Sequence, residues 1–596
     1  MCRITGVINN RLQPQLIKEQ VKAMCQALQH GGPDDEGVFF DEKNSLAFGH
    51  RRLSIIDLSI NGHQPMADPG QKTWITFNGE IYNYLEIRNE LLTLGAQFTS
   101  VTDTEVIIAA YMQWGTEAFC KFRGMFAFAL FDSIKKLTYL VRDTAGVKPL
   151  YYFAQAGQLS FASETRAFIA AGITNSNDAS WPIRFLAFGH IPEPYTTLKN
   201  VFSLAKGHYL CWDHTSSTYF IDAYKITGGY NNQITDADEA RHLIKQALIN
   251  GVGRQLIADA PLGVFLSGGT DSSLITLLAD KQKKEQLKTI SIFFNEKSYD
   301  EQAYQRLVLD KLSGQNFSHL VRQQDFETHL PQIISAMDMP TTDGINSWFI
   351  SKYAHEDGLK AVLSGIGADE YFGGYPSFTR IGYLKYLKKI PPFLFSAVQE
   401  LLPDPYKKLA FLANDNPIAD YLLLRGLFST GDIARMLDIG DREVKEVLFD
   451  SQEAQKRCVY DAEQASWFEA NLYMKNQLLR DTDVMSMNHG LEVRVPFLDE
   501  DFTTLAERIS PAIRFNPLQP KKVLIDSFND LLPQAVWNRP KMGFSFPLQR
   551  WMSQYKPIGD SNLYKGKLVK KTIKKFTNNQ IHWSKAFALY QIQPYV

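Results

Sequence analysis

The order of strands and helices changes near residue 225, and this change constrains the fold more than any other feature. Before it, short β-rich runs separated by turn residues dominate, with few helices. After it, strands and helices alternate. Clustered strands with a few helices predict an α+β layered domain, whereas alternation predicts a parallel sheet in an α/β domain. The chain is therefore expected to contain two domains of different class.

The elements expected in each part follow from hydrophobic periodicity. In the first part, strands are expected over 3–8, 46–56, 73–81, 124–132, 136–143, 150–154 and 158–163, and helices over 15–28, 84–94 and 104–114. In the second, strands are expected over 263–269, 288–294 and 359–365, and helices over 236–257, 272–286 and 300–313. The chain is mostly helical from about 380 onward. The polar, glycine-rich segment TGGYNNQ (227–233) predicts a linker between the two parts.

Composition excludes several classes of protein. Lys+Arg 63 against Asp+Glu 64 gives a net charge of −1, so no global basic field would attract nucleic acid. The five cysteines are scattered and odd in number, which does not suit a disulfide framework or a zinc cluster. The apolar run at 125–131 is far shorter than the ~20 residues of a membrane helix. We therefore expect a cytoplasmic protein that has no membrane span and binds no nucleic acid.

A cysteine follows the initiator methionine. Removal of Met1 would place a thiol and a free α-amine on one residue, Cys2. An α-amine has a pKa near ~8, so it can accept the thiol proton close to neutral pH. An N-terminal nucleophile activated by its own amine suits acyl transfer. Taken alone, Cys2 also fits an ordinary buried thiol, so its interpretation depends on its neighbours.

Several strings follow Cys2 in a fixed order: HGGPDDEG (30–37), RRLSIID (51–57), NGEIYN (78–83) and TDTE (102–105). Together with MCRITGV (1–7), they resemble the glutaminase domain of class II glutamine amidotransferases. The resemblance implies an αββα N-terminal nucleophile fold in which Cys2 attacks the carboxamide of glutamine. One departure is Gly31, because the family motif HRGPD has arginine at this position.

The resemblance assigns a role to each matched residue. Asn78 and Gly79 would stabilise the tetrahedral oxyanion, which needs preorganised N–H donors. Arg52 would bind the α-carboxylate of glutamine, and Glu80 and Asp103 its α-ammonium. The implied glutamine-binding set also contains the residues after Arg52: Leu53, Ser54, Ile55 and Ile56.

The segment SGGTDSS (267–273) follows an expected strand and opens an expected helix. Its glycines let backbone N–H groups approach phosphate, and the helix N-terminus adds positive potential. The segment matches neither GxxxxGK[ST] nor GxGxxG. It resembles the pyrophosphate loop of enzymes that split ATP into AMP and pyrophosphate.

Downstream strings extend this resemblance to the asparagine synthetases: KTISIFFNEKSYDE (288–301), LSGIGADEYFGGY (363–375), SMNHGLEVRVPFLD (486–499) and KMGFSFPL (541–548). The resemblance implies a glutaminase domain at 1–215 and an ATP-pyrophosphatase domain at 235–596, the latter with an α/β parallel sheet and a helical C-terminal part. The implied ATP site consists of Leu266, Ser267, Gly268, Gly269, Asp271, Ser272, Ile292, Ser364 and Gly365.

Two carboxylates and a lysine complete the implied synthetase site. Asp271 and Asp369 would hold Mg²⁺, which prefers oxygen ligands. Lys521 is assigned to neutralise pyrophosphate, although the adjacent Lys522 leaves the alignment open by one position. The cofactors implied are ATP and Mg²⁺, and the partners implied are small-molecule substrates and a second copy in a homodimer.

The reaction implied by the resemblance couples the two sites. Glutamine is hydrolysed to glutamate and ammonia, and a carboxylate, aspartate by family, is adenylated by ATP. Ammonia then crosses an internal tunnel and displaces AMP to leave an amide, with pyrophosphate as the other product.

Position 366 departs from the family pattern. Asparagine synthetases read SGEGxDE where this chain has Ile366 in place of the glutamate, and isoleucine cannot bind or transfer a proton. Three interpretations stay open: asparagine is made with another base, a different carboxylate is amidated (a surface-glycan uronate or a peptide carboxyl group), or the synthetase half has lost activity.

Two alternatives come from other classes. A degenerate regulatory homologue would sense glutamine or nucleotide, and a glutaminase alone would supply ammonia to a partner. The intact Cys2, Asn78, Asp271 and Asp369 argue against a pure sensor, because a sensor needs no nucleophile.

Overall fold

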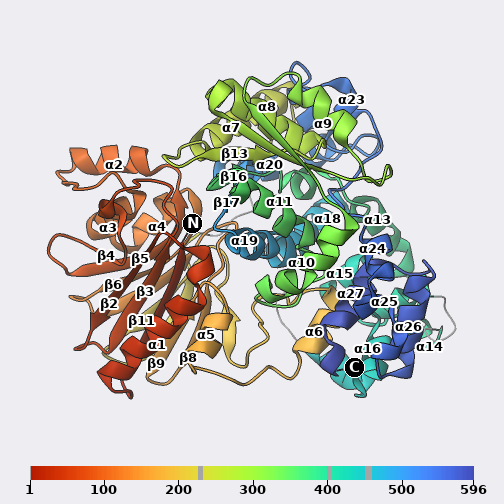
Figure 1. The fold of residues 1–596 in the computed structure, drawn as a ribbon, viewed down its shortest axis with the longest axis horizontal. Coiled ribbons are helices and arrows are strands. Elements are labelled where there is room, and N and C mark those ends of the chain that lie inside the picture. The colour runs from red at the N-terminus through yellow and green to blue at the C-terminus, as the bar shows by residue number, and fades with distance from the viewer. Residues whose placement is uncertain (1, 226–232, 399–403, 450–458, 596) are drawn as a thin grey trace.

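The structure is a computed structural model that describes residues 2–225, 233–398, 404–449 and 459–595. Figure 1 shows a strand-rich N-terminal part in red and orange beside a larger part in green and blue. The predicted linker at 227–233 lies outside the described residues, apart from its last residue.

The N-terminal part contains two six-stranded antiparallel sheets. The first has the strand order β10-β8-β9-β1-β3-β2, and the second has the order β12-β11-β7-β6-β5-β4. The strands of the first sheet are β1 (Arg3–Asn9), β2 (Asp35–Asp41), β3 (Leu46–Arg52), β8 (Tyr151–Gln155), β9 (Gln158–Ala162) and β10 (Val201–Ser203). Those of the second are β4 (Met66–Ala67), β5 (Thr73–Ile81), β6 (Gly124–Asp132), β7 (Leu137–Arg142), β11 (His208–Asp213) and β12 (Thr218–Ala223).

Alternating side chains give each sheet two apolar faces. In β1, Ile4 and Ile8 pack between the sheets, whereas Val7 packs against helix α1 (Pro14–Ala27). The helices α2 (Tyr84–Thr93) and α3 (Asp103–Trp114) cover the second sheet with a separate core. This order of layers confirms the predicted αββα sandwich.

The second part is built on a five-stranded parallel sheet of order β15-β14-β13-β16-β17. Its strands are β13 (Leu262–Phe265), β14 (Lys288–Phe293), β15 (Gln315–Leu320), β16 (Ala361–Leu363) and β17 (Glu492–Arg494). Helices α7 (Ala237–Gln255) and α8 (Thr270–Lys283) share a core with one face of the sheet. Helices α10 (Gln323–Ala336) and α11 (Ile345–Glu356) share a core with the other face. The predicted α/β class is confirmed.

The chain after β16 is mostly helical, as predicted. Its principal helices are α12 (Ala368–Phe372), α13 (Ser377–Leu387), α15 (Pro417–Arg425), α16 (Thr430–Leu437), α18 (Ala462–Phe468), a π-helix (Glu469–Leu479), α19 (Arg480–Met487), α20 (Glu500–Arg508), α22 (Lys522–Ser527), α24 (Leu548–Gln554), α26 (Lys567–Thr577) and α27 (Trp583–Gln591). Within the described ranges, none of the helices has the length and hydropathy needed to cross a membrane.

Candidate functional site

Cys2 lies at the point where β1 begins. The residue is partly buried, and its Sγ lies 3.9 Å from the carbonyl oxygen of Leu53. In the chain that still carries Met1, burial raises the pKa of the Cys2 thiol to about 11, although the amine of Met1 and Arg52 act to lower it. A thiol with so high a pKa is a weak nucleophile near neutral pH unless a base removes its proton.

Asn78 and Gly79 sit on β5, in the sheet that packs against β1. The side chain of Asn78 is completely buried, yet neither its Oδ1 nor its Nδ2 has a hydrogen-bond partner among the described residues. Buried amides are normally paired, so an unpaired one is a candidate ligand contact. Gly79 has φ +137°, and a Cβ there would lie 2.0 Å from the carbonyl oxygen of Met125. Only glycine fits this position.

Arg52 ends β3, and the chain then leaves the sheet as a loop over 53–56. The loop corrects the predicted strand at 46–56. The Arg52 guanidinium donates to the carbonyl oxygens of Ser59 at 2.8 Å and of Asp57. These contacts hold the cation beside the loop, which carries the expected glutamine-binding residues Leu53, Ser54, Ile55 and Ile56.

Two buried carboxyl groups lie at the end of β5. Glu80 belongs to the same strand, and Asp103 begins α3 and accepts a hydrogen bond from the Ile81 amide at 3.0 Å. Burial raises the pKa of Asp103 to about 7, and burial with the nearby Glu492 raises the pKa of Glu80 well above its usual value. A cationic ligand group such as an α-ammonium would relieve the cost of ionising these acids.

A residue of the second part of the chain also reaches Glu80. The Arg494 guanidinium on β17 lies 3.6 Å from Glu80 and 2.5 Å from Glu492, and it is completely buried. Sequence reasoning assigned no role to Arg494. The only signal was the alternation of charge with valine in EVR (492–494), inside a string used for recognition alone.

The SGGTDSS segment forms the loop between β13 and α8. Ser272 Oγ lies 2.9 Å from Ser267 Oγ and donates to the Gly269 carbonyl at 3.2 Å, which closes the turn. A Cβ on Gly365 would lie 2.9 Å from the Ser272 amide nitrogen, so the loops after β13 and β16 nearly touch. Because β14 and β16 flank β13 on opposite sides, these loops mark a topological switch point, where α/β sheets bind ligands.

A cavity of about 1380 Å³ opens above these loops. Its lining brings together most of the predicted synthetase residues: Ser267, Gly269, Asp271, Ser272, Ser364, Gly365, Ile366, Asp369 and Lys521. Leu266 and Ile292 are instead buried in the cores around the sheet, and Gly268, with φ +85°, is not among the lining residues. Their ATP contacts stay predictions.

Of the two adjacent lysines, Lys521 is the one that lines the cavity. Its Nζ lies 2.6 Å from Asp271 and also pairs with Asp369, which in turn lies 2.7 Å from Lys541. Although burial opposes it, these two carboxylates raise the pKa of Lys521, and Lys521 and Lys541 lower the pKa of Asp369 to about 2. The Lys522 ammonium pairs with Asp526 and does not line the cavity.

The pair Asp271 and Asp369 is chemically suited to Mg²⁺. Asp271 Oδ1 is buried and accepts no hydrogen bond from any described residue. No group of three or more possible metal ligands occurs within the described part of the chain. Mg²⁺ nevertheless commonly binds one or two carboxylates together with substrate phosphates and water. The two residues fit that coordination.

Ile366 has both apolar and acidic neighbours. Ile366 packs partly against the core below the cavity. The nearest acids in sequence are Asp369, which pairs with Lys521, and Glu370, whose Oε1 accepts a hydrogen bond from Tyr375 Oη at 2.8 Å. The cavity lining also contains polar and aromatic residues that sequence reasoning did not find: Asp343, Tyr375, Tyr421, Arg425, Tyr473 and Asp481.

Comparison with known proteins covers both parts. A family model described as a glutamine amidotransferase domain matches residues 1–224, and one described as asparagine synthase matches residues 243–575. Asparagine synthetase (glutamine-hydrolyzing) 1 of Bacillus subtilis is 32% identical over 570 residues, covering 93% of this chain and 88% of that protein. A putative asparagine synthetase of Methanocaldococcus jannaschii is 34% identical over 456 residues, covering 72% and 84%. A protein named Amidase chry2 from Gibberella zeae is 25% identical over 594 residues, covering 90% and 86%.

Proposed function

This chain belongs to the asparagine synthase family and is a carbon–nitrogen ligase with glutamine as amide donor, and we propose that its two sites run one coupled reaction. Glutamine, ATP, a carboxylate and water would give glutamate, an amide, AMP and pyrophosphate. The observation that carries the proposal is that one chain contains two such sites. Cys2 precedes β1, which packs against the strand of Asn78, whose buried amide has no partner among the described residues, and Lys521 lies between two cavity carboxylates.

In the glutaminase step, the Cys2 thiol would lose its proton to its own α-amine and attack the glutamine carboxamide. Asn78 and Gly79 would stabilise the oxyanion through N–H donors. The proton would return to the leaving ammonia, and water would release glutamate from the thioester. Arg52 would hold the substrate carboxylate, and Glu80 and Asp103 its ammonium.

In the synthetase step, an oxygen of the acceptor carboxylate would attack the α-phosphorus of ATP, and the bond to pyrophosphate would break. When bound, Mg²⁺ supplies charge neutralisation for the phosphates. Asp271 and Asp369 would hold it, and Lys521 would bind the departing pyrophosphate. Ammonia passing inside the protein would then attack the acyl-adenylate, and AMP would leave.

Aspartate is the first candidate for the acceptor, because the family model and the relatives are named for the synthesis of asparagine, the amide of aspartate. One feature favours a different carboxylate as the second candidate, because Ile366 removes the acid that would bind a small amino-acid acceptor. A uronate or a peptide carboxyl group would use the further polar and aromatic residues of the cavity lining.

The test is a panel of acceptors with glutamine, ATP and Mg²⁺, in which glutamate, pyrophosphate and the amide are followed together. Asparagine formed in step with pyrophosphate identifies aspartate, whereas pyrophosphate release only with a uronate or peptide identifies the second candidate. Glutamate without pyrophosphate for every acceptor would contradict the coupled ligase. The variant Cys2→Ala should lose the glutamine-dependent reaction and keep the ammonium-dependent one.

We also propose that the protein acts in the cytoplasm. Support comes from the four described cysteines, which are all free thiols, since oxidising compartments favour disulfides.

A further inference from the structure

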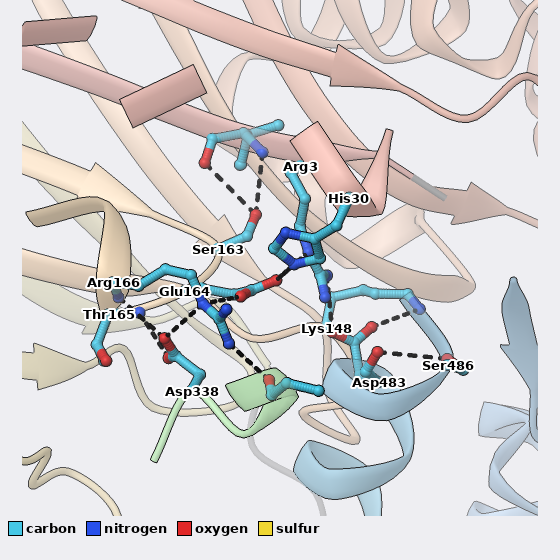
Figure 2. A network of polar contacts seen from close by, with 12 residues as sticks. Arg3, His30, Lys148, Ser163, Glu164, Thr165, Arg166, Asp338, Asp483 and Ser486 are labelled. Atoms are coloured by element: carbon cyan, nitrogen blue, oxygen red, sulfur yellow. Dashed lines mark hydrogen bonds and ion pairs between the residues drawn. The ribbon is translucent and has the colours of Figure 1, made fainter. Parts of the chain in front are cut away.

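Arg3 directly follows the proposed nucleophile and is completely buried. Figure 2 shows its side chain at the centre of a network that joins the two parts of the protein. Its Nε lies 2.7 Å from Glu164, in the loop after β9, and its Nη1 lies 2.7 Å from Asp483. Asp483 belongs to α19, so the residue beside Cys2 is held by one acid from each part of the chain.

Both acids have further partners that fix them. Glu164 also pairs with His30 at 2.9 Å and with Arg166 at 2.8 Å, and Asp483 lies 3.4 Å from the buried ammonium of Lys148. Although burial acts to raise it, His30 and Arg3 lower the pKa of Glu164 well below its usual value. Glu164 therefore stays ionised beside Arg3, and the two acids are held from both sides by their further partners.

The space that Arg3 occupies depends on Gly31. A Cβ at Gly31 would lie 2.7 Å from Cγ and 2.9 Å from Nε of Arg3. Position 31 is the one at which this chain departs from its motif by losing an arginine. The missing side chain at 31 leaves room for an arginine that enters from position 3.

Helix α19 connects Arg3 to the synthetase cavity. Successive residues of an α-helix are rotated by about 100°, so Asp481 and Asp483 face nearly opposite directions. Asp481 and Thr482 line the cavity, and Asp481 accepts a hydrogen bond from Thr341. One helix thus separates the cavity from the start of β1, with an acid directed to each side.

The start of β1 must be placed accurately for Cys2 to act. A displacement of about 1 Å in a reacting group can cost about 100-fold in rate. Arg3 is the first residue of β1 and pairs in register with Arg51, next to Arg52 in the glutamine site. Removing one partner of a buried ion pair leaves an uncompensated charge, which shifts the surrounding structure.

We propose that Arg3 is a positioning residue of the glutaminase, and that its ion pair with Asp483 of the synthetase part is needed to hold it in place. The glutaminase site would then be fully formed only when α19 is docked against β1. This inference rests on the proposed role of Cys2 as the nucleophile.

The experiment uses the full chain and the variant Asp483→Asn, which keeps the shape of the side chain and removes its charge. Glutamate formation from glutamine alone gives kcat and KM for the glutaminase, and calorimetry with MgATP gives a Kd for the other site. Asp501→Asn is the control for the loss of one acid that bridges the two parts, because Asp501 pairs with Arg123 at 3.1 Å across them and with Arg254 at 2.7 Å, away from this network.

The expected result for Asp483→Asn is a fall of about tenfold or more in glutaminase kcat, with KM for glutamine and Kd for MgATP within about twofold of the parent. Asp501→Asn should leave all three unchanged. An unchanged kcat in folded Asp483→Asn would overturn the proposal. A parallel loss of kcat, glutamine binding and MgATP binding would also overturn it, since it would show a general structural role.

A second variant decides the question if Asp483→Asn does not fold. Arg3→Lys keeps the charge but cannot reach two acids with one planar fork, so it should lower kcat in the same selective manner. The variant Cys2→Ala separates this inference from the proposed function. If Cys2→Ala still hydrolyses glutamine, the proposed function fails, whatever Arg3 does.

Discussion

Replacing Asn78 with leucine should separate catalysis from stability in one substitution. Leucine has nearly the shape of asparagine but cannot donate to an oxyanion. Loss of one such donor costs about 2.7–4 kcal/mol of transition-state stabilisation, or about 10²–10³ in kcat. The buried Asn78 amide has no partner among the described residues, so its removal breaks no hydrogen bond. Removing an unsatisfied buried polar group should leave the free energy of unfolding unchanged or raise it by about 1–3 kcal/mol.

Asn83 provides the matched control for this prediction. It is also buried, but it donates to the Lys121 carbonyl at 3.0 Å and accepts from the Arg123 amide at 2.9 Å. Asn83→Leu should therefore lower the free energy of unfolding by about 1–3 kcal/mol and leave kcat nearly unchanged.

The assay is glutamate formation from saturating glutamine, together with urea unfolding of each folded variant. The reasoning would be refuted if Asn78→Leu kept its kcat. It would also be refuted if Asn78→Leu lost as much unfolding free energy as Asn83→Leu, because Asn78 would then be a structural hydrogen-bonding residue.

Three further predictions address the other groups. Lys521→Met should lower ATP-dependent pyrophosphate release by at least about 10²-fold and spare glutamate formation. Lys522→Met alters a residue that pairs outside the cavity and should change neither rate. Equal effects of the two variants on pyrophosphate release would contradict the assignment of Lys521 to the pyrophosphate. The pKa of Asp103 is raised to about 7 in the folded protein, so folding stability falls as pH rises from about 4, near the unfolded pKa, to about 7. Asp103→Asn should therefore have a higher melting temperature than the parent at pH 8 and a higher KM for glutamine. A lower melting temperature with an unchanged KM would oppose this account. If the α-amine is the base for Cys2, the glutaminase rate should level off near pH ~8. A rate that keeps rising well above pH ~8 would show that a thiolate formed without the amine is the nucleophile.

The fold was predictable from sequence where the signal is local. Alternating apolar residues predict strands such as β6, and the strand–SGGTDSS–helix order predicts the loop before α8. Strand β15 (QNFSHL) went unpredicted because its side chains are mostly polar, and β17 because it has only three residues. These strands lie at the two edges of the parallel sheet, where pairing with a neighbour outweighs composition.

Site residues were predictable where a single sequence motif contains them, and less so where residues distant in sequence are brought together by the fold. Adjacent lysines look alike in sequence, and only the turn before α22 directs Lys521 inward and Lys522 outward. Arg494 reaches Glu80 across more than 400 positions of chain, and no local pattern reports that contact. Leu266 and Ile292 lie next to the site in sequence, but strand packing turns their side chains into the cores.

Adenylation of a carboxylate is the central claim, and isotope transfer tests it most directly. An acceptor labelled with ¹⁸O in its carboxylate is incubated with glutamine, ATP and Mg²⁺, and the products are analysed by mass spectrometry. If an acyl-adenylate forms, one ¹⁸O should appear in the phosphate of AMP, in step with unlabelled pyrophosphate and the amide. Label in inorganic phosphate with ADP as the nucleotide product, or an amide formed without any label in AMP, would contradict the mechanism.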